Sequence, residues 1–470
     1  TTGGRNVAIG YTALYSEDTT GRVVAIGYQA LENQDAAGNT YNVAIGYRSG
    51  RDIVGGVQNT LIGGDSGTAL TSGSYNTALG YNTLEGTTIG TRNVAIGQDA
   101  LATNILTDRN VAIGTAALEA MVGDGVTNNQ TTYNTAVGYG AGQAVTSGIN
   151  NNLLGGLAGA ALTAGASNVA IGYAALSTED ANGRNIAIGE LALASQNAGT
   201  DAYNVAIGYN AGTPMTTGVQ NVIIGGLAGD ALTTGNQNIA IGYQALGSED
   251  AHGKNIAIGH YALNAQDAGA DAYNVAVGWE AGKLISTGAN NVIIGGEAGD
   301  AITTGTDNIA MGRQALSTKT IGAADIAIGH QALQDADGGD AYNVAVGWRA
   351  GRNITTGIRN ILIGASAGDS LSSGIDNIAI GYQTLVSEDT HSYNTAVGHQ
   401  ALKDQNAGAD AYNVAMGYRA GYAVTTGPYN TLIGGLAGDA ITTGNRNTVL
   451  GYNALSAETT GHRSVAIGTG

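Results

Sequence analysis

The chain has 470 residues with 77 glycines, 2 prolines and no cysteine, and its formal net charge is -18 at pH 7. Glycine does not recur at every third position, which excludes a collagen helix, and the missing thiols exclude a disulfide framework. The acidic balance argues against binding to nucleic acid or to an anionic membrane surface. No apolar run approaches the roughly 20 residues that a membrane-spanning helix needs, so we expect no membrane insertion.

A short repeat fills the chain from its first residues. Asn6–Gly10 reads Asn-Val-Ala-Ile-Gly, and about 27 variants of it follow one another, most often 17 residues apart, as far as Gly468. A unit this short cannot bury its apolar side alone and must stack on its neighbours. We therefore predict an all-β fold, a parallel β-solenoid of about 27 short turns that forms a single domain over residues 1–470. Thr1–Gly4 has neither an initiator Met nor a signal-peptide pattern, so we expect a segment of a longer polypeptide.

One repeat, residues 238–255, predicts the local structure. In Ile239–Ile241 a small residue lies between two large ones, the alternation expected of a strand, and Gly242 ends it. The residue before the motif glycine is always aliphatic or Met, so we expect it to point inward. Tyr243–Leu246 is predicted to form a second short extended segment, and the remaining residues form turns.

An asparagine precedes the motif glycine by four residues in 24 of the 27 copies. The exceptions are Val23, Asp325 and Ser464. Stacked amides can hydrogen-bond along a solenoid while they cap its turns, so we expect a structural ladder rather than a ligand site. Representative members of the ladder are Asn6, Asn42, Asn168, Asn238, Asn308, Asn377 and Asn447.

The spacing between motif glycines lengthens once, to 24 residues between Gly114 and Gly138. We predict a protruding loop at residues 121–132. A tolerated insertion is the simpler interpretation, and a binding loop is the alternative.

From Gly172 onward the repeats cycle through four kinds, and a full cycle takes 69 or 70 residues. In the third kind, the residue two before the motif glycine becomes a large aliphatic, while the tyrosine after the glycine becomes Gly or Ala. We interpret this as an exchange of volume on the outward face. It predicts a subunit interface and a parallel homotrimer, with a monomeric rod as the alternative. The candidate outer-face and interface residues are Leu61, Leu153, Ile223, Ile293, Leu362, Leu432, Trp279 and Trp348.

The histidines do not form a catalytic or metal centre in the sequence. His260, His330 and His399 occupy equivalent positions four turns apart, about 19 Å, and cannot share a metal ion. Serine and threonine lack a recurring His and Asp neighbour, so a hydrolase triad is not supported. We predict no enzyme, no catalytic residue and no cofactor. The other histidines fall in turns and are expected to be solvated: His252, His391 and His462.

Two classes of turn aspartate recur with the four-turn cycle. Such carboxylates could bind Ca²⁺ together with carbonyl groups, but the dense Gly-Asp alternation of calcium-binding repeats is missing. Turn capping is the simpler interpretation, and Ca²⁺ is the alternative. The residues are Asp201, Asp271, Asp340 and Asp410 in one class and Asp230, Asp300, Asp369 and Asp439 in the other.

The string Asn-Val-Ala-Ile-Gly-Tyr-x-Ala-Leu, followed by Thr-Thr-Gly, resembles the head repeats of trimeric autotransporter adhesins of the YadA type. Its longer period is similar to that of repeats in bacteriophage tail-fibre proteins. Asn6–Gly21 and Asn447–Gly461 carry the resemblance most clearly, and it extends over essentially the whole chain. It implies a left-handed parallel β-roll, homotrimeric, that is carried on a virion or cell surface and used for attachment.

We therefore expect an extracellular structural and adhesive fibre, whose partners are two further copies of itself and a host or cell-surface receptor such as a glycan. A glycan-processing β-helix enzyme is one alternative, although the acidic residues follow the cycle instead of gathering at one place. An ice- or mineral-binding solenoid is another, because Thr-Thr-Gly recurs in register. Other residues replace the threonine doublet in half of the turns, which argues against it.

Overall fold

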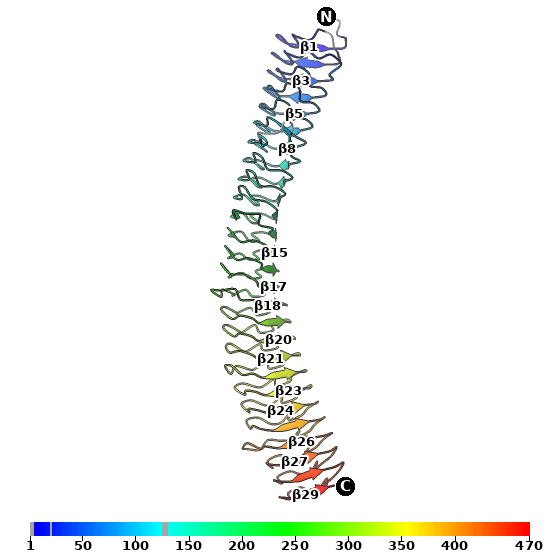
Figure 1. Ribbon diagram of the computed structural model, residues 1–470, viewed down its shortest axis with the longest axis vertical. Coiled ribbons are helices and arrows are strands. Elements are labelled where there is room, and N and C mark those ends of the chain that lie inside the picture. The colour runs from blue at the N-terminus through cyan, green and yellow to red at the C-terminus, as the bar shows by residue number, and fades with distance from the viewer. Residues whose placement is uncertain (1–3, 19–20, 125–129) are drawn as a thin grey trace. The chain divides into compact units, whose positions relative to one another are not determined.

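The computed structural model describes residues 4–18, 21–124 and 130–470. The chain divides into two compact units, residues 1–237 and 238–470, and each is a parallel β-solenoid (Figure 1). Together they contain about 27 turns, which confirms the predicted all-β parallel β-solenoid. The described residues form no helix, and so none that could cross a membrane.

Each turn contributes one three-residue strand, which ends on the residue before the motif glycine. In the first unit the strands are β1 (Val7–Ile9), β2 (Val24–Ile26), β3 (Val43–Ile45), β4 (Thr60–Ile62), β5 (Thr77–Leu79), β6 (Val94–Ile96), β8 (Val111–Ile113), β10 (Thr135–Val137), β11 (Asn152–Leu154), β12 (Val169–Ile171), β13 (Ile186–Ile188), β14 (Val205–Ile207) and β15 (Val222–Ile224). In the second unit they are β16 (Ile239–Ile241), β17 (Ile256–Ile258), β18 (Val275–Val277), β19 (Val292–Ile294), β20 (Ile309–Met311), β21 (Ile326–Ile328), β22 (Val344–Val346), β23 (Ile361–Ile363), β24 (Ile378–Ile380), β25 (Thr395–Val397), β26 (Val414–Met416), β27 (Thr431–Ile433), β28 (Thr448–Leu450) and β29 (Val465–Ile467). Within each unit, neighbouring strands pair in parallel, residue for residue, as β14 does with β15.

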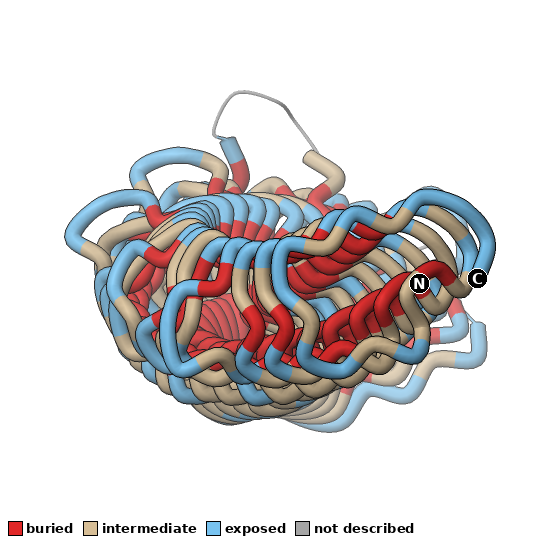
Figure 2. The backbone as a smooth tube through the Cα atoms, turned by 90° about the horizontal axis from the view of Figure 1, so that it is seen from below, coloured by how far each residue is buried: buried red, intermediate tan, exposed pale blue. Residues whose placement is uncertain are grey.

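The middle residue of each strand, not the last, points into the solenoid. In β14, Ala206 is fully buried, whereas Val205 and Ile207 are partly exposed. The prediction that the residue before the motif glycine points inward is therefore wrong. The reason is space, because Ala192 and Leu193, from the turn that follows β13, are also fully buried in this narrow interior. Figure 2 shows the buried positions along the inside of the coil.

The six large aliphatics that were predicted on the outer face lie in the core. All are fully buried: Leu61, Leu153, Ile223, Ile293, Leu362 and Leu432. The physical reason is a different exchange of volume from the one predicted. The leucine that lies four residues after the motif glycine in many turns, such as Leu31, is replaced by glycine in others, as at Gly50. A Cβ added at Gly50 would lie 2.8 Å from Leu61 Cδ1 and 2.9 Å from Leu31 Cδ2, so the larger strand residue fills the space that the missing leucine leaves.

Tyr243–Leu246 forms turns instead of the predicted second extended segment. Gln244 and Leu246 have φ values of 50° and 53°, and a residue in this left-handed region cannot continue a strand. Ala245 and Leu246 are nevertheless fully buried. The segment thus contributes to the core while it reverses the chain.

The predicted insertion at residues 121–132 is partly built into the fold. Met121 is fully buried, and β9 (Gln130–Thr131) pairs in parallel with β7 (Thr107–Asp108). Residues 125–129 of the predicted loop lie outside the described residues.

Candidate functional site

The ladder asparagines bind successive turns to each other inside the solenoid. Asn42 Oδ1 accepts a hydrogen bond from the backbone N–H of Asn59 at 2.8 Å, and Asn42 Nδ2 donates to the Gly56 carbonyl at 2.8 Å. Buried amides that bond to the next turn in this way fix the register of the coil. Asn6, in the first coil, is partly exposed. The other representative members are buried: Asn42, Asn168, Asn238, Asn308, Asn377 and Asn447.

At one exception to the ladder, a buried ion pair replaces the amide. Asp325 and Lys319 are both fully buried, and Lys319 Nζ lies 2.9 Å from Asp325 Oδ2. Asp325 Oδ1 accepts from the Asn343 N–H at 2.8 Å, as a ladder asparagine would. Lys319 Nζ also donates to the Gly339 carbonyl at 3.1 Å. The aspartate therefore keeps the acceptor that the next turn needs, and the lysine neutralises its charge.

The outward face of the strands is the most extensive candidate for a contact surface. In one coil, Tyr203 and Tyr209 are exposed, and Val205 and Ile207 between them are partly exposed. Other coils of each unit repeat this pattern. We call the outward residues of the strands, with the aromatic residue that follows the motif glycine, the strand face. Its aromatic members are Tyr11, Tyr28, Tyr47, Tyr81, Tyr139, Tyr173, Tyr209, Tyr243, Trp279, Trp348, Tyr382, Tyr418 and Tyr452.

Trp279 and Trp348 lie on the outside, where the sequence placed them, and are 50% and 48% exposed in the single chain. Several rings in this column stack from one coil to the next. The Tyr11 and Tyr28 ring centroids are 5.4 Å apart, and the His260 ring lies 5.3 Å from that of Tyr243. Offset stacking of this kind favours a regular column, because each ring covers part of its neighbour.

A second exposed column, just before the ladder asparagine, carries tyrosines and basic residues. Arg184 lies 5.4 Å from the Tyr203 ring and donates to its hydroxyl at 3.0 Å. Lys254 is placed in the same way over Tyr273, 5.1 Å from the ring. In these cation–π contacts the positive charges of Arg184 and Lys254 are held against tyrosine rings of the same chain.

Two aspartates of the first class, Asp271 and Asp201, cap turns and pair with this column. Asp271 Oδ1 accepts from the Gly253 N–H at 3.0 Å, and Asp271 Oδ2 lies 2.6 Å from Lys254 Nζ. The hydrogen bond to Asp271 raises the pKa of Lys254 to about 12. Asp201 makes the equivalent ion pair with Arg184. These contacts show turn capping, and they occupy the carboxylates.

The second class is partly buried, and burial changes the titration of three of its members. Burial raises the pKa of Asp300 to about 6, and it also raises the pKa of Asp230 and of Asp369. Asp300 Oδ1 has no hydrogen-bond partner among the described residues. The Asp300 carboxylate is therefore a local cost to folding at neutral pH.

We expect Asp300→Asn to stabilise the chain at pH 7. The native pKa of about 6 lies above the ordinary value of 3.8. Between these values the folded chain binds more protons than the unfolded chain, so the stability of the wild type falls as pH rises from about 4 to about 6. The variant has no carboxylate at this position, so its stability should not fall in this way. Urea midpoints measured from pH 4 to pH 7 should therefore show the variant becoming increasingly more stable than the wild type as pH rises.

Asp376→Asn is the matched control for the pH experiment, because Arg359 lowers the pKa of Asp376. Removal of that carboxylate should destabilise the chain above pH 4, and the difference should shrink as pH falls. Equal pH profiles for Asp300→Asn and the wild type would contradict the assignment.

One open depression on the described surface lies beside the turns of the first unit. It holds about 520 Å³ and is lined in part by Arg51, Asp52 and Glu85. Arg51 Nη2 lies 2.7 Å from Asp52 Oδ2, so these two charges neutralise each other. The depression offers no cluster of acid and base groups that would mark it as a catalytic cleft.

A set of buried glutamates was not anticipated from the sequence. Glu179, Glu249 and Glu388 are fully buried seven residues after a motif glycine, and burial raises the pKa of each. His391, which was expected to be solvated, lies with its Nδ1 2.8 Å from Glu388 Oε1, and its side chain is only 14% exposed. The pairing of a histidine with the glutamate three residues earlier could have been found at Glu249 and Glu388, where the sequence reads Ser-Glu-Asp-x-His.

No protein-family model matches this chain, and no curated protein matches it either. The functional argument therefore rests on the geometry described above.

Proposed function

We propose that the chain is a structural and adhesive segment of an extracellular fibre, in which three parallel copies meet through the strand face. The segment would provide reach and stiffness and would display many equivalent turns for attachment to a host or cell surface. The resemblance to YadA-type heads and phage tail fibres supports a left-handed roll carried on a cell or virion surface.

The observation that carries the proposal is the apolar strand face. Val205, Ile207 and Tyr209 are examples of side chains left open to solvent in a single chain, and their equivalents recur on successive coils of each unit. Monomeric soluble proteins rarely expose contiguous apolar patches larger than a few hundred Å². Rotational symmetry would let three chains bury the same face against one another.

The alternatives receive less support. In Thr-Thr-Gly turns the first threonine donates its hydroxyl to the next coil, as Thr303 Oγ1 does to the Thr320 carbonyl at 2.7 Å and Thr442 Oγ1 does to the Thr459 carbonyl at 2.9 Å. An ice-binding array would leave such hydroxyls for water. Against a glycan-processing enzyme, Asp201 and Asp271 of the first class are engaged in caps and ion pairs.

The mass of the purified chain in solution tests the assembly. A trimer of 46.8 kDa chains would have a mass of about 140 kDa (3 × 46.8) by sedimentation equilibrium. Ile207→Lys with Ile380→Lys places one charge on the strand face of each unit, at partly exposed positions where the lysine can reach water in the monomer. We expect this double variant to sediment as a folded monomer.

Thr217→Lys with Thr287→Lys is the matched control, because it adds the same charge at exposed turn positions. This variant should remain trimeric. A wild-type chain that sediments at 46.8 kDa at micromolar concentration would overturn the proposed assembly, as would a trimer insensitive to lysine on the strand face.

Attachment is tested separately by comparing the wild type with the lysine double variant on a glycan array. Three linked copies of a weak site can increase apparent affinity by roughly 10²-fold or more through avidity. We expect binding by the wild type and a loss of about that size in the monomeric variant. A chain that binds no glycan and no cell surface would leave the fibre without an adhesive role.

A further inference from the structure

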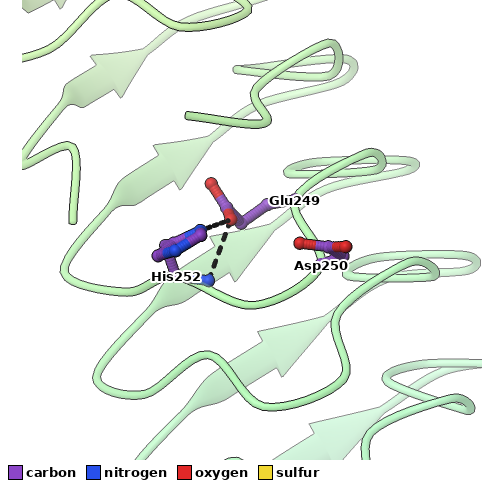
Figure 3. Close-up of side chains that lie close together, drawn as sticks. All are labelled: Glu249, Asp250 and His252. Atoms are coloured by element: carbon purple, nitrogen blue, oxygen red, sulfur yellow. Dashed lines mark hydrogen bonds and ion pairs between the residues drawn. The ribbon is translucent and has the colours of Figure 1, made fainter. Parts of the chain in front are cut away.

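Two turns of the second unit bring together a glutamate, the aspartate after it and a histidine two residues further on. One turn holds Glu249, Asp250 and His252, and an equivalent turn later in the unit holds Glu388, Asp389 and His391. Within each group, one nitrogen or oxygen atom of every side chain lies within 4.8 Å of those of the others. Figure 3 shows the first group, in which the Glu249 carboxylate faces the His252 ring.

The buried glutamate has an oxygen that the fold does not use. Glu249 is fully buried, and its Oε1 accepts from the His252 N–H at 3.0 Å and lies 3.5 Å from His252 Nδ1. Glu249 Oε2 and His252 Nδ1 have no hydrogen-bond partner among the described residues. A buried carboxylate oxygen without a hydrogen bond, next to an imidazole whose Nδ1 also lacks one, is costly unless a further group binds them.

The second turn repeats this arrangement with shorter separations. His391 Nδ1 lies 2.8 Å from Glu388 Oε1 and 3.7 Å from Asp389 Oδ1. Glu388 is fully buried, and its Oε2 is again without a hydrogen-bond partner among the described residues. Two independent turns therefore present the same three ligand types in the same order.

The separations and the ligand types fit a borderline divalent ion. Ligand atoms on one tetrahedral zinc ion lie roughly 3.3 Å apart, since each bond is about 2.0–2.1 Å long. One imidazole with two carboxylates suits Zn²⁺ and its neighbours in the first transition series, whereas Ca²⁺ prefers oxygen ligands alone. We infer that the turns at Glu249–His252 and Glu388–His391 are two divalent transition-metal sites, with Zn²⁺ as the best fit.

At two other turns the position seven residues after the motif glycine carries glutamine, which is hydrogen-bonded inside the coil without a metal. Gln266 Oε1 accepts from Asn274 Nδ2 at 2.7 Å, and Gln196 Oε1 accepts from Asn204 Nδ2 at 3.1 Å. Glutamate is thus not required by the packing of the coil. The turn at Glu179 has the same Glu-Asp pair but carries Asn182 where the others carry histidine, so it provides an internal control.

Zinc titration of the untagged full chain tests the inference. After treatment with EDTA and dialysis, isothermal titration with zinc chloride should give two sites per chain. His252→Asn should leave one site and His252→Asn with His391→Asn should leave none, while Asn182→His should add one. Circular dichroism checks that each variant is folded, which is expected because Asn182 shows that the turn tolerates asparagine.

His462→Asn is the control for nonspecific binding, and it should leave both sites intact. The inference is overturned if the wild type binds no zinc below millimolar concentration, or if the double histidine variant keeps the wild-type stoichiometry. In the first case the histidines serve only as partners of buried glutamates. The metal experiment is independent of the oligomeric state, so its outcome and that of the fibre proposal can be distinguished.

Discussion

Replacement of Gly46 by alanine is expected to destabilise its coil by roughly 3 kcal/mol, the sum of backbone strain and steric overlap. Gly46 has φ +141°, a region that L-residues rarely adopt, and an added Cβ would overlap the carbonyl oxygen of Gly63 in the next coil. Neither the strain nor the overlap can relax without separating the two coils. Urea denaturation followed by circular dichroism, with limited proteolysis of the native chain, should detect the loss.

Gly55→Ala is the matched control in the same coil. No heavy atom of the described chain lies within 4 Å of a Cβ built there, and its φ is not in the left-handed region. This variant should unfold within about 0.5 kcal/mol of the wild type, as is usual for surface changes. If the two alanine variants lose equal stability, the close approach of the coils is not the reason why glycine recurs at the motif position of every turn.

The second large effect is expected at the buried pair of Lys319 and Asp325. Asp325→Asn leaves the lysine charge buried without its partner. Lys319→Met leaves the Asp325 carboxylate buried without its partner. Each single variant should lose about 3–5 kcal/mol, the usual cost of breaking a buried ion pair from one side. Thermal and urea midpoints at pH 7 give these values.

The double variant Lys319→Met with Asp325→Asn should recover most of that stability, to within about 1 kcal/mol of the wild type. It reproduces a pair that the chain already contains, because Met215 and Asn221 occupy the same two positions in an earlier coil, with Met215 Sδ 3.7 Å from Asn221 Nδ2. A double variant that loses the sum of the two single costs would show that the charges do not act as a pair.

The repeat predicted the strands and their parallel stacking because a 17-residue period with one three-residue alternation has few other ways to bury apolar side chains. It did not predict which face is inside. Ile239 and Ile241 are larger than Ala240, so size alone favoured them as core residues, but the interior is too narrow for two branched side chains per strand. The six residues from Leu61 to Leu432 were misplaced for the same reason.

A pairing of positions could have corrected the assignment. Where the middle residue of the strand is leucine or isoleucine, the position four after the next motif glycine is glycine instead of leucine, as Gly67 is after Leu61. Such opposed changes in size indicate two side chains that share one interior space. The ion pair of Lys319 with Asp325 could also have been inferred from the sequence. In this coil aspartate replaces the ladder asparagine, and lysine lies six positions before it, where most coils carry an uncharged residue.

The buried glutamates could not be placed from the sequence, because Ser-Glu-Asp is an ordinary composition for an exposed turn. Only the structure shows that Glu249 points inward while Asp250 remains exposed. The histidines were treated one by one as members of repeating columns. Their association with a neighbouring glutamate at a spacing of three residues was therefore overlooked.

The proposed trimer should bury Trp279 and Trp348, the only tryptophans of the chain, which are half exposed in the single chain. Acrylamide, a neutral quencher, reports their exposure without interference from the acidic surface. If three chains meet through the strand face, the wild type should show weak quenching and blue-shifted emission, and the monomeric variant Ile207→Lys with Ile380→Lys should show severalfold stronger quenching. Strong and equal quenching in both proteins would contradict burial of the strand face between chains.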